Sequence, residues 1–254
     1  MARQARRKSQ SGIYHIILRG INKQFIFEDD EDKMKFLECL MHYKGICQYM
    51  IYGYCLMDNH VHLLIKESEE DISAIMKRIG VRYVAWYNRK YNRCGHLFQD
   101  RFKSEVVEND EYLLVVLRYI HQNPLKAGLV QDLESYKSSS YIEYISNHQI
   151  IDADFILGLF SKNKDRAIKN FRQFMNERTG EVGCIEVDKK TMLTDEEVKM
   201  VIQQYANVSA PFELQAMEKK DRDERIRKIK LIQGISTRQI ARLTGISQSV
   251  IARA

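Results

Sequence analysis

The chain has 254 residues, of which 44% are hydrophobic and 29% charged, and its formal net charge is +6. This length suits one domain with a full core and a second, smaller one. No apolar run reaches the roughly eighteen residues that a membrane span needs, and no apolar signal core follows the basic N-terminus, so we expect a cytoplasmic protein without a membrane partner. The five scattered cysteines argue against a disulfide framework or a zinc knuckle.

Basic residues gather near both ends of the chain. Residues 1–8 contain four basic residues and no acid, and residues 219–242 contain nine basic against three acidic residues. A polyanion such as a nucleic acid would explain this distribution. A solvated helix face would explain either run alone.

Strand and helix patterns alternate over the first hundred residues. In chain order, we expect a strand at 12–18, a helix at 29–45, a hairpin with strands at 51–57 and 60–65, a helix at 71–92 and a strand at 102–107. This β-α-β-β-α-β order predicts an α+β, ferredoxin-like fold, in which two helices cover one face of a four-stranded antiparallel sheet. In the first helix, Met34, Leu37, Leu40 and Met41 recur at helical spacing.

The rest of the chain is predicted to be largely helical. A helix is expected over 110–123, with Asp110 as its cap and Pro124 as its end, because the residue before a proline disfavours helical angles. We divide the chain into a basic arm at 1–9, the α+β domain at 10–146, a helical extension and linker at 147–192, and a helical tail at 193–254. Two short helices are expected between residues 152 and 176.

The predicted hairpin carries a pair of histidines. Asp58 and Asn59 favour a tight turn, and His60 and His62 follow at the start of the second strand. Residues two apart on a strand share a face, so the two imidazoles project side by side. Two neutral imidazoles supply half of a divalent-metal site. An isolated pair of this kind is more often an ordinary surface feature, so residues elsewhere must decide.

Tyr119 and Asn123 lie four residues apart on the predicted helix and therefore share a face. Asn123 could add an oxygen ligand, and a metal held there would lie near the Tyr119 hydroxyl. An unassisted tyrosine, with a pKa of about 10, is a poor nucleophile. A metal can polarise a phosphodiester and position it for in-line attack. The product would be a covalent phosphotyrosine, which suits DNA breakage and rejoining better than hydrolysis.

Other residues compete for these roles. The same Tyr-to-Asn-Pro spacing is common at ordinary helix ends. Tyr112 is an alternative nucleophile, although it has no polar partner one turn later. His15 is expected to support the site or fill the core rather than bind metal, and His121 is expected on another face of the helix.

Three stretches, residues 57–65, 95–104 and 118–130, together resemble the REP-associated tyrosine transposase branch of the HUH single-tyrosine transposases. Residues 14–20 match the opening strand of that branch, and the resemblance covers about residues 10–145. It implies the ferredoxin-like fold, a single-stranded DNA hairpin as substrate, a 5′-phosphotyrosine intermediate, and Mg²⁺ or Mn²⁺ as cofactor. By the resemblance, His60 and His62 bind the metal, Tyr119 is the nucleophile, and Asn123 replaces a glutamine as third ligand.

Two groups of residues in the α+β domain are candidate DNA contacts. Arg19, Asn22 and Lys23 occupy the first predicted loop, and Arg101 and Lys103 alternate near the last predicted strand. They could bind DNA phosphates. Arg101 and Lys103 would equally suit the exposed face of an edge strand.

The tail ends in a predicted helix-turn-helix over residues 235–254. Ser236 and Ser247 are expected to cap its two helices, and Gly245 permits the turn. With a preceding helix at 221–233, it resembles the helix-turn-helix half of the C-terminal domain of the replication initiator DnaA. Contacts to double-stranded DNA are expected from Arg238, Arg242, Gln248, Ser249 and Arg253. A helical hairpin used only for packing would show the same pattern.

Three functions remain open on this basis. The first is a transposase-like nickase and strand-transferase for single-stranded DNA, acting as a monomer or homodimer. The second is a non-catalytic DNA-binding regulator that uses the tail. The third is a metal phosphohydrolase, but the histidine-triad type alternates three histidines and Leu64 stands at the third position.

Overall fold

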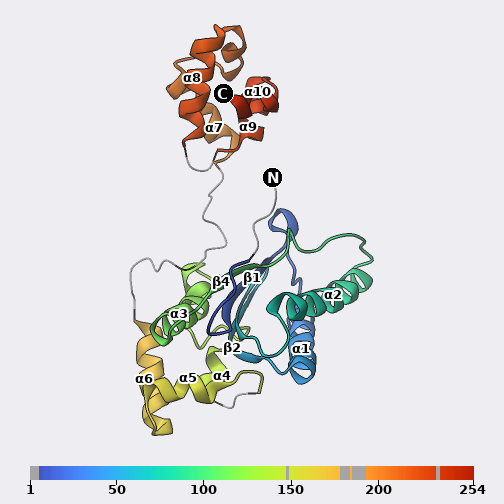
Figure 1. The fold of residues 1–254 in the computed structure, drawn as a ribbon, viewed down its shortest axis with the longest axis vertical. Coiled ribbons are helices and arrows are strands. Elements are labelled where there is room, and N and C mark those ends of the chain that lie inside the picture. The colour runs from blue at the N-terminus through green and yellow to red at the C-terminus, as the bar shows by residue number, and fades with distance from the viewer. Residues whose placement is uncertain (1–5, 147–148, 178–183, 185–192, 233–234) are drawn as a thin grey trace. The chain divides into compact units, whose positions relative to one another are not determined.

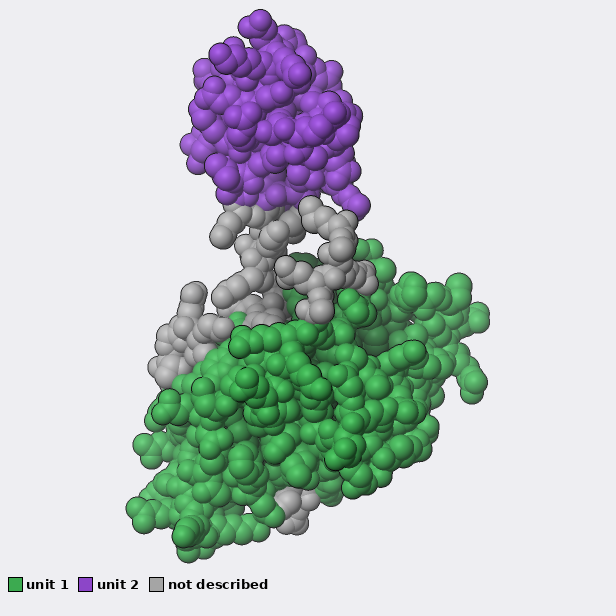
Figure 2. All heavy atoms as spheres, viewed as in Figure 1, with its two compact units in different colours: residues 1–187 green, residues 188–254 purple. Residues whose placement is uncertain are grey.

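The computed structural model describes residues 6–146, 149–177, 184, 193–232 and 235–254. The chain divides into two compact units, residues 1–187 and 188–254, which Figure 2 shows in different colours. Each unit has its own cluster of buried hydrophobic side chains. Among the described residues, no helix is long and apolar enough to cross a membrane.

The first unit is built on a four-stranded antiparallel sheet with the order β2-β3-β1-β4 (Figure 1). Its strands are β1 (Ile13–Arg19), β2 (Met50–Met57), β3 (His60–Lys66) and β4 (Lys103–Val106). Two helices connect them, α1 (Asp30–Cys47) and α2 (Ile72–Lys90), and a 3-10 turn η1 (Ile21–Lys23) follows β1. The predicted ferredoxin-like order is confirmed.

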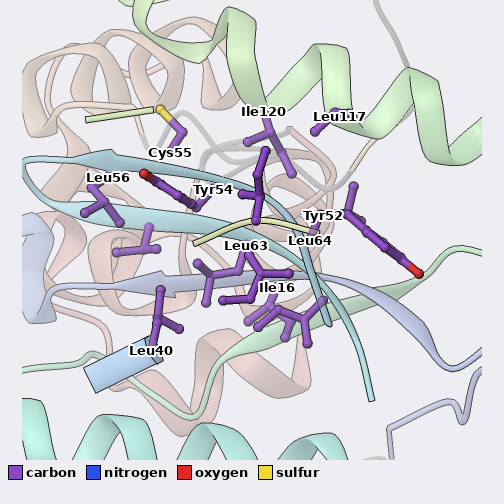
Figure 3. Close-up of a cluster of buried hydrophobic side chains, with 14 of the residues drawn as sticks. Ile16, Leu40, Tyr52, Tyr54, Cys55, Leu56, Leu63, Leu64, Leu117 and Ile120 are labelled. Atoms are coloured by element: carbon purple, nitrogen blue, oxygen red, sulfur yellow. The ribbon is translucent and has the colours of Figure 1, made fainter. Parts of the chain in front are cut away.

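The two faces of this sheet differ in what covers them. Helix α3 (Asp110–Lys126) packs over one face, where Gly53 lets it come close: a Cβ on Gly53 would lie 2.5 Å from the Leu117 Cδ1 atom. Figure 3 shows Leu117 and Ile120 of α3 on one side of the strands and Leu40 of α1 on the other. Helix α1 therefore covers the opposite face, and α2 packs beside α1 on that side, with the Tyr83 ring against that of Phe36 (Figure 1).

Strand register assigns the histidines to the α3 face. Cross-strand partners share a face. Gly53 pairs with Leu64 on β3, and His62, two residues away, lies on the same face. Ile17 of β1 pairs with both His62 and Lys103, so β4 also presents Lys103 to the α3 side.

Helix α3 differs from its prediction at both ends. Asn109 rather than Asp110 is the cap, because its side chain accepts a hydrogen bond from the Tyr112 backbone N–H. The helix also continues through Pro124 to Lys126, so the predicted end was wrong. Proline removes the backbone donor for the Ile120 carbonyl. The Asn123 side-chain amide, 2.8 Å from the Tyr119 carbonyl and 3.5 Å from that of Ile120, compensates for the missing donor.

The apolar stripe expected on α1 is only partly correct. Met34 and Met41 are 63% and 49% exposed, whereas Phe36, Cys39 and Leu40 are buried. Two stripes of this helix have helical spacing, and spacing alone does not choose between them. The buried stripe is the one that contains Phe36, whose large aromatic ring packs against the rings of Phe27 and Tyr83.

Three further helices complete the first unit: α4 (Tyr141–Ile145), α5 (Ala153–Phe160) and α6 (Lys164–Asn176). The two short helices expected between 152 and 176 are confirmed. Before α4, the chain runs along the open edge of β2, where the Leu56 N–H donates to Ser138 O and the Ser140 N–H to Tyr54 O. This segment protects the edge strand from pairing with other chains. Most of the predicted linker lies outside the described residues.

The second unit is helical. It contains α7 (Asp195–Ala206), the 3-10 helix η2 (Pro211–Ala216), α8 (Lys219–Lys230), α9 (Thr237–Thr244) and α10 (Gln248–Arg253). Ser236 caps α9 in a reciprocal pair with Gln239, and Gly245 takes a left-handed conformation with φ of 72° between α9 and α10. Ser247 precedes α10, but its side chain makes no capping hydrogen bond there. It lies 3.2 Å from the Ser249 hydroxyl instead.

Candidate active site

The histidine pair begins at a two-residue turn. Asp58 and Asn59 connect β2 to β3 as predicted, and the backbone N–H groups of Ile26 and Phe27 donate to Asp58 O at 2.8 and 3.1 Å. The Asn59 Oδ1 atom lies 2.6 Å from His60 Nδ1. The rings of His60 and His62 are 5.0 Å apart between centroids. The turn thus holds both imidazoles side by side.

His62 is the buried member of the pair, with no exposed surface. Its Nδ1 atom lies 3.0 Å from His15 Nε2, whereas its own Nε2 atom is buried without a hydrogen-bond partner. Burial, and then the neighbouring His15 and His60, hold the pKa of His62 well below its usual value. The ring is therefore neutral, as a metal ligand must be. A buried, partnerless nitrogen on a neutral imidazole fits a divalent metal.

Tyr119 lies beside this histidine in the same chain. Its ring centroid is 5.6 Å from that of His62 and 5.8 Å from that of His15, and the side chain is 6% exposed. The Lys126 Nζ atom lies 4.8 Å from the centre of the Tyr119 ring. The structure therefore brings a phenol, an ammonium group and the histidine pair together.

Asn123 lies one turn beyond Tyr119 on α3, half-buried. Its amide nitrogen is used by the helix backbone, so the carboxamide oxygen is the atom that could serve as a ligand. Within the described ranges, no group of three or more His, Cys, Asp and Glu side chains is arranged to hold a metal. Asparagine is not in that class, and its role as third ligand stays a prediction.

Tyr112, the alternative nucleophile, has a different environment. Burial and a hydrogen bond with Glu105 raise the pKa of its hydroxyl above the usual value. A raised pKa makes the phenolate, which is the attacking form, harder to reach. The Glu105 carboxylate also lies 3.5 Å from His15 Nδ1. Tyr112 therefore contacts the support of the site rather than the site itself.

Three of the predicted DNA contacts meet in one recess of about 100 Å³ on the α3 face. It is lined by Ile17, Arg19, Gln99, Asp100, Arg101 and Lys103. Ile17 is the register partner of His62, so the recess adjoins the histidine pair. Asn22 and Lys23 are exposed in η1, where both have positive φ, and they do not line it.

Sequence reasoning missed several of these residues. Glu105 alternates with Lys103 on β4, so their shared face was visible in the sequence, but the pairing of β4 with His15 was not. Lys126 is two helical turns after Tyr119, a spacing that was hidden by the expectation that the helix stops at Pro124. Gln99 and Asp100 lie within the stretch 95–104 that carries the family resemblance, but this segment has no periodicity that would have given either residue a role of its own.

The expected DNA-contacting residues of the tail all lie at its surface: Arg238, Arg242, Gln248, Ser249 and Arg253. Three of them have partners within the unit, since the Ser249 hydroxyl lies 3.2 Å from that of Ser247. Arg242 forms an ion pair with Asp195, with N–O distances of 2.5 and 2.6 Å, and Arg253 Nε donates to Ser249 O.

Comparison with known proteins gives consistent matches. Residues 8–123 match the family described as Transposase IS200 like. A provisionally named REP-associated tyrosine transposase of Haemophilus influenzae is 26% identical over 141 residues, which are 50% of this chain and 77% of the relative. The solved structure of a REP-associated tyrosine transposase bound to a REP hairpin shares the fold, with a TM-score of 0.51 and 16% identity, over 61% of this chain and 90% of that one. The residues that match the IS200-like transposase family, 8–123, contain the histidine pair and Tyr119.

Proposed function

We propose that this protein is a metal-dependent nickase and strand-transferase for single-stranded DNA, with Tyr119 as its nucleophile. The match of residues 8–123 to a transposase family supports a DNA-processing enzyme. The structural relative was solved with a REP hairpin, which makes hairpin DNA the substrate class to test. One observation carries the proposal: the partnerless Nε2 atom of His62 belongs to a neutral, buried ring whose centroid is 5.6 Å from that of Tyr119.

The residues divide the chemistry between them. His60 and His62, with Asn123 as the proposed third ligand, would hold Mg²⁺ or Mn²⁺, which when bound supplies a Lewis acid for an oxygen of the scissile phosphate. The Tyr119 hydroxyl loses its proton and its oxygen attacks phosphorus. The bond from phosphorus to the 3′ oxygen breaks, and that oxygen takes up a proton. One strand end remains on Tyr119 as a 5′-phosphotyrosine, and attack by a 3′ hydroxyl reverses the step.

Two cationic features support this assignment. The Lys126 ammonium group, 4.8 Å from the Tyr119 ring centre, favours the negative charge that develops on the phenol oxygen. Arg19, Arg101 and Lys103 line the recess beside the histidine pair. Cationic side chains there would hold a DNA phosphate that flanks the scissile one.

A second function, a DNA-binding regulator without catalysis, has one observation in its favour. The second unit exposes Gln248, Ser249 and Arg253 on the second helix of its helix-turn-helix, where a reading helix presents its side chains. In the main proposal, this unit selects the DNA site for the first. Binding that survives EDTA, with no covalent product on any DNA, would favour the regulator.

A covalent-adduct assay tests the main proposal. Wild-type protein, Tyr119→Phe and Tyr112→Phe would be mixed with labelled single-stranded hairpins in Mn²⁺ or in EDTA, and run on a denaturing gel. We expect a metal-dependent adduct with wild-type protein and Tyr112→Phe, and a loss of at least about 1,000-fold with Tyr119→Phe, because the bond-forming atom is removed. An adduct that persists in Tyr119→Phe and disappears in Tyr112→Phe would overturn the assignment.

A further inference from the structure

Behind the histidine pair, the structure places a chain of polar side chains that the proposed reaction does not use directly. Tyr112 hydrogen-bonds with Glu105, Glu105 Oε2 lies 3.5 Å from His15 Nδ1, and His15 Nε2 lies 3.0 Å from His62 Nδ1. These residues come from α3, β4, β1 and β3. His15 and His62 have no exposed surface, and the Glu105 side chain is 20% exposed.

We propose that His15, backed by Glu105, is a positioning residue that fixes His62 in the tautomer protonated on Nδ1, so that Nε2 presents its lone pair to the metal. This inference rests on the proposed function, because it concerns the same metal site. His15 itself does not contact the metal or the substrate in this scheme.

The argument compares the two ways in which one proton can lie between the rings. If His62 Nδ1–H donates to His15 Nε2, then His15 carries its own proton on Nδ1, facing the Glu105 carboxylate. His62 Nε2 is then an unprotonated acceptor. In this arrangement the His62 Nδ1 proton has an acceptor, and the His15 Nδ1 proton, which makes no hydrogen bond, faces the Glu105 carboxylate at 3.5 Å.

The opposite placement of the proton is unfavourable for two reasons. If His15 Nε2–H donates to His62 Nδ1, the proton of His62 moves to Nε2, which is buried and has no partner. A buried donor without an acceptor is unfavourable. The His15 Nδ1 lone pair would also face the Glu105 carboxylate, and two acceptors repel each other. The Glu105 carboxylate therefore determines the tautomer of His15, and His15 in turn determines the tautomer of His62.

His60 shows the same principle with a simpler partner. Its Nδ1 atom lies 2.6 Å from Asn59 Oδ1, an acceptor that requires a proton on Nδ1. Both histidines of the pair are thus held through Nδ1, one by an amide oxygen at the turn and the other by the buried His15. Partners of this kind behind metal ligands typically change metal affinity by 10–100-fold when removed.

The test measures Mn²⁺ affinity by calorimetry on the full chain, without DNA. We expect His15→Leu, which removes the acceptor, to weaken Mn²⁺ binding by about 10-fold or more. His15→Gln, whose amide oxygen can accept the His62 proton and whose NH₂ can face Glu105, should retain most of the affinity. Glu105→Leu leaves His15 in place but frees its tautomer, and should lose several-fold. His121→Leu is the matched control, because His121 is also buried and has one polar partner, Ser140; its affinity should be unchanged.

A second readout observes the tautomer directly. Long-range ¹H–¹⁵N correlation spectra of metal-free, ¹⁵N-histidine-labelled protein should show His62 protonated on Nδ1, and a shift toward Nε2 protonation in Glu105→Leu. A His62 ring protonated on Nε2 in the wild-type protein would overturn the inference, even if His15→Leu fails to fold.

The outcomes also separate this inference from the proposed function. If His62→Ala leaves Mn²⁺ affinity unchanged, the assignment of His62 to the metal site is wrong. Both the proposed function and the positioning role of His15 are then contradicted. If His62→Ala abolishes binding whereas folded His15→Leu and Glu105→Leu bind Mn²⁺ like wild-type protein, only the positioning role fails.

Discussion

Helix α3 has a buried histidine on each of two sides, and the two are alike in nearly every local property. His62 packs from the sheet against the Tyr119 side, and His121, on α3 itself, points toward α4 and α6, where its ring contacts Tyr141, Tyr144 and Phe171. Both are almost fully buried, and both have one ring nitrogen without a hydrogen-bond partner. Burial lowers the pKa of each.

The difference lies in what surrounds each ring. Around His62 are a second imidazole of the pair, the Tyr119 phenol, and His15 with its carboxylate. Around His121 are aromatic rings and the Ser140 hydroxyl, which itself accepts from the Tyr54 backbone N–H. A depressed pKa and a partnerless nitrogen are therefore products of burial. Only the convergence of several reactive groups marks a site.

The sharpest way to break this comparison is to substitute both histidines alike. We expect His62→Gln to reduce metal-dependent adduct formation by at least about 100-fold. Loss of a residue that only supports a metal ligand typically lowers metal affinity or activity by about 10–100-fold, and loss of the ligand itself should lower it at least as much. His121→Gln keeps the bond to Ser140 and should stay within a few-fold of wild type. The measurement is adduct yield on a hairpin oligonucleotide in Mn²⁺. Equal losses in the two variants would show that both histidines are needed for packing, and would contradict a metal-binding role for His62.

Much of this contrast could be predicted from the sequence. The turn at Asp58 and the alternation of His60 with His62 defined the pair, and the four-residue spacing from Tyr119 placed Asn123 on the same side of α3. Spacing within one element is local, and the sequence shows it directly.

What the sequence could not show depends on tertiary packing. The pairing of His15 with Glu105 across β1 and β4 depends on strand register, which only the assembled sheet defines. Lys126 was missed because the proline rule ended α3 too early, and the rule failed because the Asn123 side chain compensates for the missing donor. Asn22 and Lys23 were grouped with Arg19 by proximity in the chain, yet η1 leads them away from the recess that Arg19 lines.

A smaller effect, on stability rather than activity, distinguishes the His121 side. Burial lowers the pKa of His121 to about 3, whereas an unfolded histidine titrates near 6.5. The folded-state pKa is the lower one, so its contribution to stability is present above about pH 6.5 and is lost as the pH falls. Between about pH 7.5 and 5 this loss amounts to about 2 kcal/mol. His121→Gln should therefore lose about 2 kcal/mol less than wild type over that range.

Urea unfolding at several pH values measures this difference. The single tryptophan, Trp86, lies in α2 of the first unit, so its fluorescence follows that unit. Parallel pH profiles for wild-type protein and His121→Gln would mean that His121 titrates normally, and that its burial is not what depresses acid stability.

The smallest expected effect concerns charge on the two sides of α3. Lys103 lines the recess beside the histidine pair, whereas Lys169 is exposed on α6, the helix that packs on the His121 side. A lysine that contacts a DNA phosphate releases a counterion, so its loss should weaken binding a few-fold and lower the slope of log affinity against log salt by about 0.7 for single-stranded DNA. We expect this for Lys103→Gln and not for Lys169→Gln, measured by fluorescence anisotropy with a hairpin oligonucleotide in EDTA. Because both substitutions remove one exposed positive charge, a long-range attraction by net charge would change both alike. Only a local contact in the recess would separate them.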